Sequence, residues 1–443
     1  MRATPLLRGC IAALILVASL PGGALASPSV RAADPAGSVA QIGAAPEPMS
    51  KQERAPGGPP PEPPFTLVRP TTKPVTPGTA ETDPVKLTSP SAILVDAQSG
   101  KVLYERNSHE RRAPASVTKV MTLVIAFDCI REGKCKLDDK ITISDEAAAQ
   151  VGTIIFADTG EQFTLRELLL SIAVGSANDA SIAVAEHVAG TEQGFVNLMN
   201  QRAQDLGLKD THFANPTGLT ADGHLTSAHD LAMISRYASL NYPELMKLTA
   251  VYDAKLNVPW RKNGPTFQLW NNNKLLTWYE GADGMKTGWT QAAGYCLAAT
   301  AQRSGVRMIS VVMGAADPKV RNAEAARLLD WGFANYTVVQ VAPAGQSVGK
   351  VPVMRGEIDQ IDAVPTIPFG VSVPKGRKGQ ISHQVQLKEQ VVAPIKAGDP
   401  VGEIIALVDG KEAARAPLVA KVDVPVATYW KSVIKILLHM LKV

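Results

Sequence analysis

The pattern of apolar and polar positions changes several times along the chain. A short apolar run follows two arginines within residues 1–26, and residues 27–87 show almost no apolar periodicity. Residues 88–336 contain apolar helical stretches between short strands, and residues 337–426 carry short alternating runs. The last segment, 427–443, has a wide apolar arc beside a narrow basic face. These changes predict five segments of different physical character.

The segment 88–336 is predicted to be an α+β unit in which strands begin and end the fold and helices lie between them. The stretch 116–130 is strongly apolar but too short to span a bilayer, so we expect a buried core helix. Thr164 and Glu167 have the spacing of a capping box. The predicted strands are 92–96, 101–104, 282–288, 295–300 and 308–314, and the predicted helices are 116–130, 165–174 and 179–188.

Residues 1–26 have the three parts of a secretory signal peptide. Arg2 and Arg8 precede an apolar run over 11–20, and Ala24-Leu25-Ala26 forms a small-residue cleavage site. The run is too short for a membrane-spanning anchor. We therefore expect export across the cytoplasmic membrane and a periplasmic location.

Residues 27–87 are predicted to be an extended, disordered linker. The region around them up to residue 90 holds about half of the chain's 32 Pro, with few apolar residues to form a core. The segment 337–426 is predicted to be a small all-β domain, because Asp409-Gly410 lies between two apolar runs as in a β-hairpin. No catalytic constellation is present in that domain.

Residues 427–443 are predicted to form an amphipathic helix. Its basic and polar positions fall on one narrow face, and aromatic and aliphatic residues cover the remainder. Such a helix suits an anionic membrane interface, which predicts peripheral attachment to the inner membrane. The alternative is a terminal helix that packs on the β domain. The positions of the narrow face are Lys431, Lys435, His439 and Lys442.

Composition excludes several functional classes. A net charge of +4 over 443 residues argues against a nucleic-acid-binding protein. The four Cys include no C-x-x-C pair and the seven His show no metal spacing, so no metal or cofactor is expected. A disulfide between Cys129 and Cys135 is plausible in an oxidising compartment and stays open, whereas Cys296 is predicted to be a buried thiol.

Three short motifs supply candidate chemistry. Ser116 and Lys119 lie one helical turn apart, so the Lys amine can reach the Ser hydroxyl and act as its base. Ser176 and Asn178 fall in a break between two predicted helices, where they can face a cleft. The third motif, Lys286-Thr287-Gly288, ends a predicted strand whose edge could pair with an extended peptide. Each motif alone is weak.

The order of the three motifs is that of the serine penicillin-recognising enzymes. The runs 112–119, 215–219 and 283–288 resemble the D-alanyl-D-alanine carboxypeptidases, serine peptidase family S11, which are low-molecular-mass penicillin-binding proteins. The resemblance is close over roughly 88–336, and the β domain and tail match the family's layout more loosely. It implies a serine β-lactamase/DD-peptidase-like fold, with an antiparallel sheet, a helical cluster and a C-terminal all-β domain.

The resemblance also implies roles for the first two motifs. Ser116 would attack the carbonyl between the two terminal D-alanines of a peptidoglycan pentapeptide stem, and Lys119 would be the base. Ser176, Asn178 and Lys286 would complete the proton network. β-Lactam antibiotics would acylate Ser116 as covalent inhibitors.

Substrate-binding roles follow from the same resemblance. Lys286, Thr287 and Gly288 would position the substrate, and Trp289 would give a backbone N–H to the oxyanion. Several relatives carry His where this chain has Trp289. The resemblance therefore does not fix the substrate preference or the deacylation rate of this chain. Arg321 is similar to the family's carboxylate-binding Arg, and a solvent-exposed Arg at a helix start is the alternative.

Two other functions compete with the carboxypeptidase. A serine β-lactamase would need an extra carboxylate base, and Glu161 and Glu167 lie upstream of the second motif rather than downstream. A non-catalytic penicillin-binding envelope protein is the other alternative, and the intact Ser116, Lys119 and Lys286 argue against it.

Overall fold

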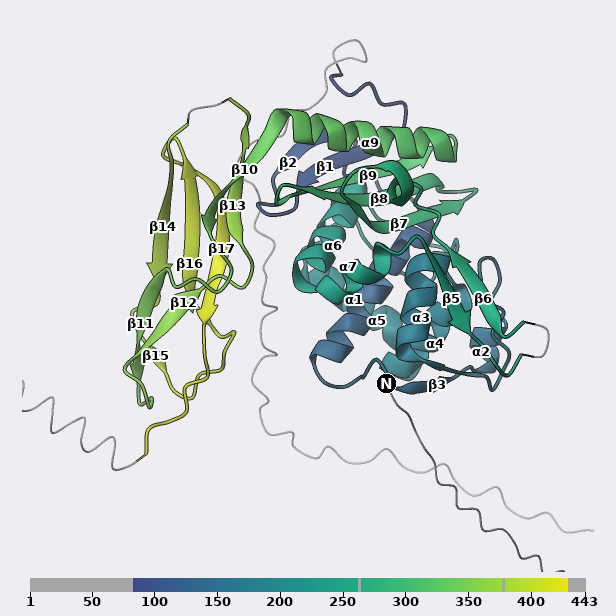
Figure 1. Cartoon of the computed structure of the whole chain (residues 1–443), viewed down its shortest axis with the longest axis horizontal. Helices are drawn as coiled ribbons and strands as arrows, with labels where there is room; N and C mark the ends of the chain where they lie inside the picture. Colours follow the sequence, from purple (N-terminus) through teal and green to yellow (C-terminus); the bar gives the residue numbers. More distant parts are fainter. Residues whose placement is uncertain (1–82, 262–263, 377–378, 429–443) are drawn as a thin grey trace, which may run out of the picture. The chain divides into compact units, whose positions relative to one another are not determined.

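The structure is a computed structural model that describes residues 83–261, 264–376 and 379–428 (Figure 1). The predicted signal peptide, residues 27–82 of the predicted linker and residues 429–443 of the predicted tail lie outside the described residues. Among the described helices, none combines the length and the apolar character that crossing a membrane requires.

A five-stranded antiparallel sheet forms the centre of the first domain, with strand order β2-β1-β9-β8-β7. Ser91 of β1 pairs with Met313 of β9, so the opening hairpin and the closing strands share one sheet. This arrangement confirms the predicted α+β fold. The strands are β1 (Ser91–Asp96), β2 (Val102–Arg106), β7 (Ala282–Thr290), β8 (Gly294–Arg303) and β9 (Val306–Ala315).

Helices cover both faces of this sheet (Figure 1). Ile93 contributes to the larger core under the helical cluster, and its neighbour Leu94 contributes to the core under α9 (Pro318–Asn335). This alternation is what a strand buried on both faces requires. The other elements are η1 (Ala115–Thr118), α1 (Lys119–Arg131), β3 (Lys140–Thr142), α2 (Asp145–Ala148), β4 (Gln162–Thr164), α3 (Leu165–Leu170), η2 (Ser171–Gly175), α4 (Asn178–Ala189), α5 (Glu192–Asp205), α6 (Ala228–Asn241), α7 (Pro243–Thr249), β5 (Asp253–Asn257), β6 (Thr266–Trp270) and α8 (Leu275–Trp278).

Two predicted helices differ from regular α-helices where the motifs occur. The helix expected over 116–130 begins with the 3-10 turn η1, and α1 follows from Lys119. The helix expected over 165–174 keeps its capping box at Thr164 but widens into the π-helical turn η2 after Leu170. Such local departures are frequent at functional sites.

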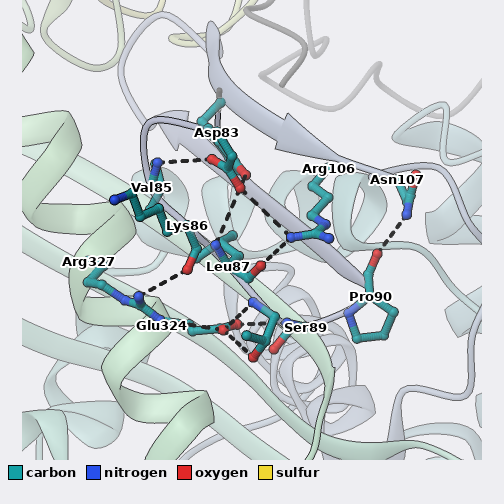
Figure 2. A network of polar contacts seen from close by, with 12 residues as sticks. Asp83, Val85, Lys86, Leu87, Ser89, Pro90, Arg106, Asn107, Glu324 and Arg327 are labelled. Atoms are coloured by element: carbon teal, nitrogen blue, oxygen red, sulfur yellow. Dashed lines mark hydrogen bonds and ion pairs between the residues drawn. The ribbon is translucent and has the colours of Figure 1, made fainter. Parts of the chain in front are cut away.

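The chain enters the first domain through a short strap, residues 83–90, that is fastened to α9 and β2 (Figure 2). The buried Glu324 carboxylate of α9 accepts hydrogen bonds from Thr88 N at 2.5 Å, Thr88 Oγ1 at 2.7 Å and Ser89 N at 3.1 Å. Asp83 accepts hydrogen bonds from Val85 N at 2.9 Å and from the Tyr104 hydroxyl at 3.0 Å. Residues 83–87, which fall within the predicted linker, therefore contact the first domain, through Asp83 and through Lys86 O, which accepts a hydrogen bond from Arg327 Nη1 at 3.0 Å.

The second domain is all-β, as predicted. Its six-stranded sheet has the order β14-β16-β17-β12-β11-β15, and β10 pairs with β13 in a separate ribbon. The predicted hairpin at Asp409-Gly410 is present, with Val408 opposite Lys411. The strands are β10 (Tyr336–Ala342), β11 (Gly349–Met354), β12 (Gln360–Val364), β13 (Phe369–Pro374), β14 (Ile381–Leu387), β15 (Val391–Val392), β16 (Pro400–Val408) and β17 (Lys411–Ala420).

The cysteines of the described chain form one disulfide and one free thiol. Cys129 at the end of α1 forms a disulfide with Cys135, with the two Cα atoms 5.4 Å apart. Cys296 is a buried free thiol in β8, as predicted, and burial raises its pKa to about 11.

Candidate active site

Ser116 and Lys119 meet at the junction of η1 and α1. Lys119 Nζ lies 3.1 Å from Ser116 Oγ, within hydrogen-bond distance, and donates a hydrogen bond to the backbone carbonyl of Thr217 at 2.6 Å. The residue before the nucleophile, Ala115, has a φ of 49°, a conformation that L-residues rarely adopt. Thr122 ties the first turn of α1 to Pro216 O at 2.7 Å. The strained turn is thus held by its surroundings, as strained functional residues require.

The second motif lies where η2 ends. Ser176 adopts a left-handed φ of 62°, which stops the helix and turns its side chain toward the cleft. Asn178 begins α4, and its side chain accepts a hydrogen bond from Lys119 Nζ at 2.7 Å and donates one to Val151 O at 2.6 Å. Asn178 therefore links Lys119 to the loop 151–157 on one side of the cleft.

Lys286 lies on β7, buried beside the nucleophile's turn, and its Nζ donates to Thr287 O at 3.0 Å. Burial and then the positive charge of Arg321 lower the pKa of Lys286 to about 7. Within the described residues, no direct hydrogen bond joins Lys286 to Ser116, Lys119 or Ser176.

The electrostatics of the site favour a neutral amine at Lys119. Its side chain is 0% exposed, and this burial lowers its pKa well below the ordinary value. The charge of Lys286 lowers the pKa further. A lysine with a depressed pKa can accept a proton from a serine hydroxyl near neutral pH.

A cleft of about 500 Å³ opens above these groups. Six of the nine predicted site residues line it, whereas Lys119, Asn178 and Lys286 lie in the buried layer beneath. The lining residues are Ser116, Thr153, Ser176, Asn272, Lys274, Thr287, Gly288, Trp289, Tyr295, Pro318, Arg321 and Asn322.

Gly288 is required for the close approach of β7 to the nucleophile's turn. A Cβ at this position would lie 2.9 Å from the backbone nitrogens of both Ser116 and Val117. Those atoms are backbone and cannot move aside cheaply, so only glycine fits. The strand edge and the amide of Ser116 consequently line the same end of the cleft. Trp289 follows, 56% exposed, with its ring 5.9 Å from that of Tyr295.

Arg321 lies in the first turn of α9 and is buried rather than solvent-exposed. Its Nη2 donates to Asn272 O at 3.3 Å and its Nε to Asn322 Oδ1 at 3.1 Å. Burial lowers its pKa to about 10, so it stays a cation at neutral pH. This position allows it to bind an anionic group in the cleft.

Sequence reasoning missed several contributors to the site. The carbonyl of Thr217 contacts both Lys119 Nζ and, at 3.5 Å, Ser116 Oγ, and a backbone acceptor leaves no residue-type signal in a sequence. In the Asn triplet 271–273, the side-chain amides of Asn271 and Asn273 donate hydrogen bonds to Val251 O at 3.1 Å and to Gly284 O at 2.9 Å. Asn272 between them lines the cleft. Within the described residues, no group of three or more His, Cys, Asp or Glu could hold a metal ion.

Comparisons with known families agree with this geometry. The peptidase S11 family, described as D-alanyl-D-alanine carboxypeptidase, matches residues 78–317, and the family described as penicillin-binding protein 5, C-terminal domain, matches residues 336–426. The chain belongs to the D-alanyl-D-alanine carboxypeptidase family. Its activity class is accordingly that of a serine-type, penicillin-binding D-Ala-D-Ala carboxypeptidase.

Individual relatives cover most of the chain. D-alanyl-D-alanine carboxypeptidase DacF of Bacillus subtilis is 40% identical over 340 residues, which is 76% of this chain and 86% of the relative. DacA of Escherichia coli K12 is 34% identical over 361 residues, with 79% and 87% covered. The crystal structure of penicillin-binding protein 5 from Haemophilus influenzae gives a TM-score of 0.61 at 33% identity, covering 76% of this chain and 98% of that chain. The predicted DD-peptidase-like fold is confirmed.

Proposed function

We propose that the protein removes the terminal D-alanine from peptidoglycan pentapeptide stems through an acyl-enzyme on Ser116, with Lys119 as the base. The observation that carries this proposal is the contact of 3.1 Å between a fully buried amine and the Ser116 hydroxyl. The amine of Lys119 accepts the hydroxyl proton while Ser116 Oγ attacks the carbonyl carbon of the penultimate D-alanine. The proton then passes to the leaving amine, and water hydrolyses the ester.

The remaining residues have positioning roles in this proposal. Backbone N–H groups of Ser116 and Trp289 stabilise the oxyanion, because Gly288 brings β7 against the nucleophile's turn. Arg321 and Lys286 supply positive charge for the terminal carboxylate, and Thr287 lines the same wall. Ser176 and Asn178 belong to the proton network. Asn178 fixes the position of Lys119 Nζ by accepting its hydrogen bond.

β-Lactams fit the same chemistry as suicide substrates, since their strained amide presents a carbonyl to Ser116. A related penicillin-binding protein D2 from Listeria monocytogenes, 28% identical with a TM-score of 0.50, has been solved in an ampicillin-bound form.

The β-lactamase alternative lacks a free carboxylate in the right place. Glu161 is engaged by Arg261 at 2.5 Å and by Trp260 Nε1 at 2.7 Å, and Glu167 caps α3. Within the described residues, the cleft lining contains no Asp or Glu. This composition favours slow release of β-lactam acyl groups.

D-Alanine release tests the proposal directly. The chain without residues 1–26 is expected to remove the terminal residue from a pentapeptide ending in D-Ala-D-Ala, and not from the same stem ending in D-Ala-L-Ala. Mass spectrometry of the shortened tetrapeptide product measures cleavage of both stems, because the second stem would release L-alanine. Equal cleavage of both stems, or of neither, contradicts the proposal.

The pH profile of kcat/KM is expected to be bell-shaped. Lys119 must be neutral to act as base, so the rate rises with pH through its lowered pKa. Lys286 must be charged, and its pKa of about 7 makes the rate of the free enzyme fall above that pH. Because Arg321 lowers the pKa of Lys286, Arg321→Gln should move the falling limb to higher pH. Penicillin acylation rates between about pH 5 and pH 10 measure both limbs of the profile. If the falling limb of Arg321→Gln stays at the wild-type pH, the assignment of that limb to Lys286 is wrong.

The protein is further proposed to act in the periplasm, attached peripherally to the inner membrane. Residues 1–26 support export, and the basic amphipathic segment 427–443 supports attachment. The disulfide between Cys129 and Cys135 is consistent with an oxidising compartment.

Deletion of residues 429–443 is expected to release the protein from membranes. The deletion removes the apolar arc and all three tail lysines, so sedimentation with anionic vesicles should fall at least about tenfold. The intact mature chain is the control, and unchanged penicillin labelling verifies the fold. Sedimentation that is unaffected by the deletion rules out the tail as the anchor.

A further inference from the structure

The exposed large aliphatic side chains of the second domain gather at one end. Within the described part of residues 336–428, five such side chains are 42–56% exposed. All five fall in three segments, 354–359, 391–395 and 421–428, which we call the tip. They are Met354, Ile358, Val392, Val422 and Val426.

Backbone pairing places the three segments of the tip together. Met354 of β11 lies beside Val392 of β15 in a parallel register, so their side chains share one face. Gly356 bridges to Val426, and Ala427 N donates to Arg355 O at 2.8 Å. The tip is therefore a defined surface rather than scattered residues.

The described chain leaves the domain at this same end (Figure 1). The last described residue is Thr428, two residues beyond Val426, and Tyr429, Trp430 and Lys431 follow in the sequence. The proposed membrane helix thus begins directly at the exposed aliphatic residues. A tail bound in the headgroup region would hold the tip at the bilayer surface.

We propose that the tip is a second lipid contact, which inserts Met354 and Val392 into the interface of the membrane that the tail binds. This inference rests on the membrane attachment proposed above. Once the tail is bound, the tip is tethered within a few residues of the bilayer, so its insertion has the advantage of a high effective concentration. Aliphatic groups in the interface add binding free energy in proportion to the area they bury.

A second copy of the chain is a poorer occupant. Five half-exposed aliphatic side chains offer less apolar area than the about 800 Å² per partner of a stable protein interface. A bilayer requires no complementary surface shape. Because the proposed membrane-binding tail begins at the tip, its position favours the bilayer over a second copy of the chain.

The test uses the chain from residue 27 to 443 with Val392→Cys, labelled with an environment-sensitive thiol dye. Labelling is selective, because Cys129 and Cys135 are joined and Cys296 is buried. Lys411→Cys is the matched control, an exposed position at the far end of β17. That strand has 10 residues, which corresponds to a length of about 30 Å.

On vesicles of phosphatidylglycerol and phosphatidylethanolamine, the dye at position 392 should shift to the blue and be quenched by spin-labelled lipids, whereas the dye at 411 should not. In the unlabelled chain, Met354→Glu with Val392→Glu should lower vesicle partitioning at least about tenfold. Val392→Thr, which keeps the side chain's shape, should give a smaller loss. Leu198→Glu, an exposed aliphatic position on α5, should have no effect. Penicillin labelling verifies that each variant is folded.

Several outcomes overturn the inference. If the wild-type chain binds vesicles but the dye at 392 does not respond, the tip does not touch lipid, although membrane attachment stands. If the wild-type chain does not bind, membrane attachment itself fails and the inference fails with it. A blue-shifted dye without vesicles shows a protein occupant instead, the tail if the shift is independent of concentration and a second copy if it grows with concentration.

Discussion

Ser116→Ala should lower D-alanine release by at least about 10⁴-fold, because the variant has no nucleophile while the rest of the cleft is intact. Loss of the hydroxyl removes one hydrogen bond from Lys119 Nζ, which keeps its bonds to Asn178 and Thr217. The fold should therefore survive. Steady-state release from a D-Ala-D-Ala pentapeptide measures the loss.

The control for this variant is Ser239→Ala, a serine on α6 whose hydroxyl bonds only to Arg236 O in the described structure. That change should leave release within about twofold of wild type. Covalent labelling with penicillin shows whether Ser116 is the nucleophile. Covalent labelling that persists in Ser116→Ala would show that another residue forms the acyl-enzyme.

Lys119→Met should slow acylation by penicillin and by pentapeptide by about 10²- to 10⁴-fold, the usual contribution of a general base. Methionine has a similar length and fits a buried site, but its thioether cannot accept the Ser116 proton. Methionine leaves Asn178 Oδ1 and Thr217 O without their Lys119 donor, a cost that is partly offset because no amine has to be desolvated. A melting temperature that stays well above the assay temperature separates a loss of chemistry from a loss of fold.

A matched control for this variant is Lys140→Met, an exposed lysine on β3. The second-order rate constant for penicillin acylation is the measurement, because it reports the acylation step without deacylation. A rate within about tenfold of wild type would show that Lys119 is not the base and would direct attention to Ser176 or Lys286.

Much of the site could be predicted from the sequence because its side-chain chemistry lies in short local motifs. Ser116 and Lys119 are one turn apart, so their contact follows from helical spacing alone. The contact between Lys119 and Asn178 could be inferred only through the family resemblance, because it joins residues that are distant in the chain.

Other features could not be predicted because they depend on backbone geometry. The left-handed conformations of Ala115 and Ser176 are imposed by tertiary packing, against the local preference of both residues. The carbonyl of Thr217 acts through an atom that every residue possesses. Arg321 has a helical sequence context that suits an exposed surface, and only the packing of α9 near Asn272 shows that it is buried.

The strap at residues 83–90 has a practical consequence for inhibitor discovery. A shortened enzyme that began at the first strand, Ser91, would remove the Thr88 and Ser89 donors from the Glu324 carboxylate, which would keep its ion pair with Arg327 at 3.5 Å. A hydrogen bond to a charged group commonly contributes about 1.5–3 kcal/mol. Glu324 lies one helical turn after Arg321, so the damage would reach the helix that presents the cation to the cleft. Truncated forms of the enzyme that are used in inhibitor screens should therefore begin upstream of Asp83.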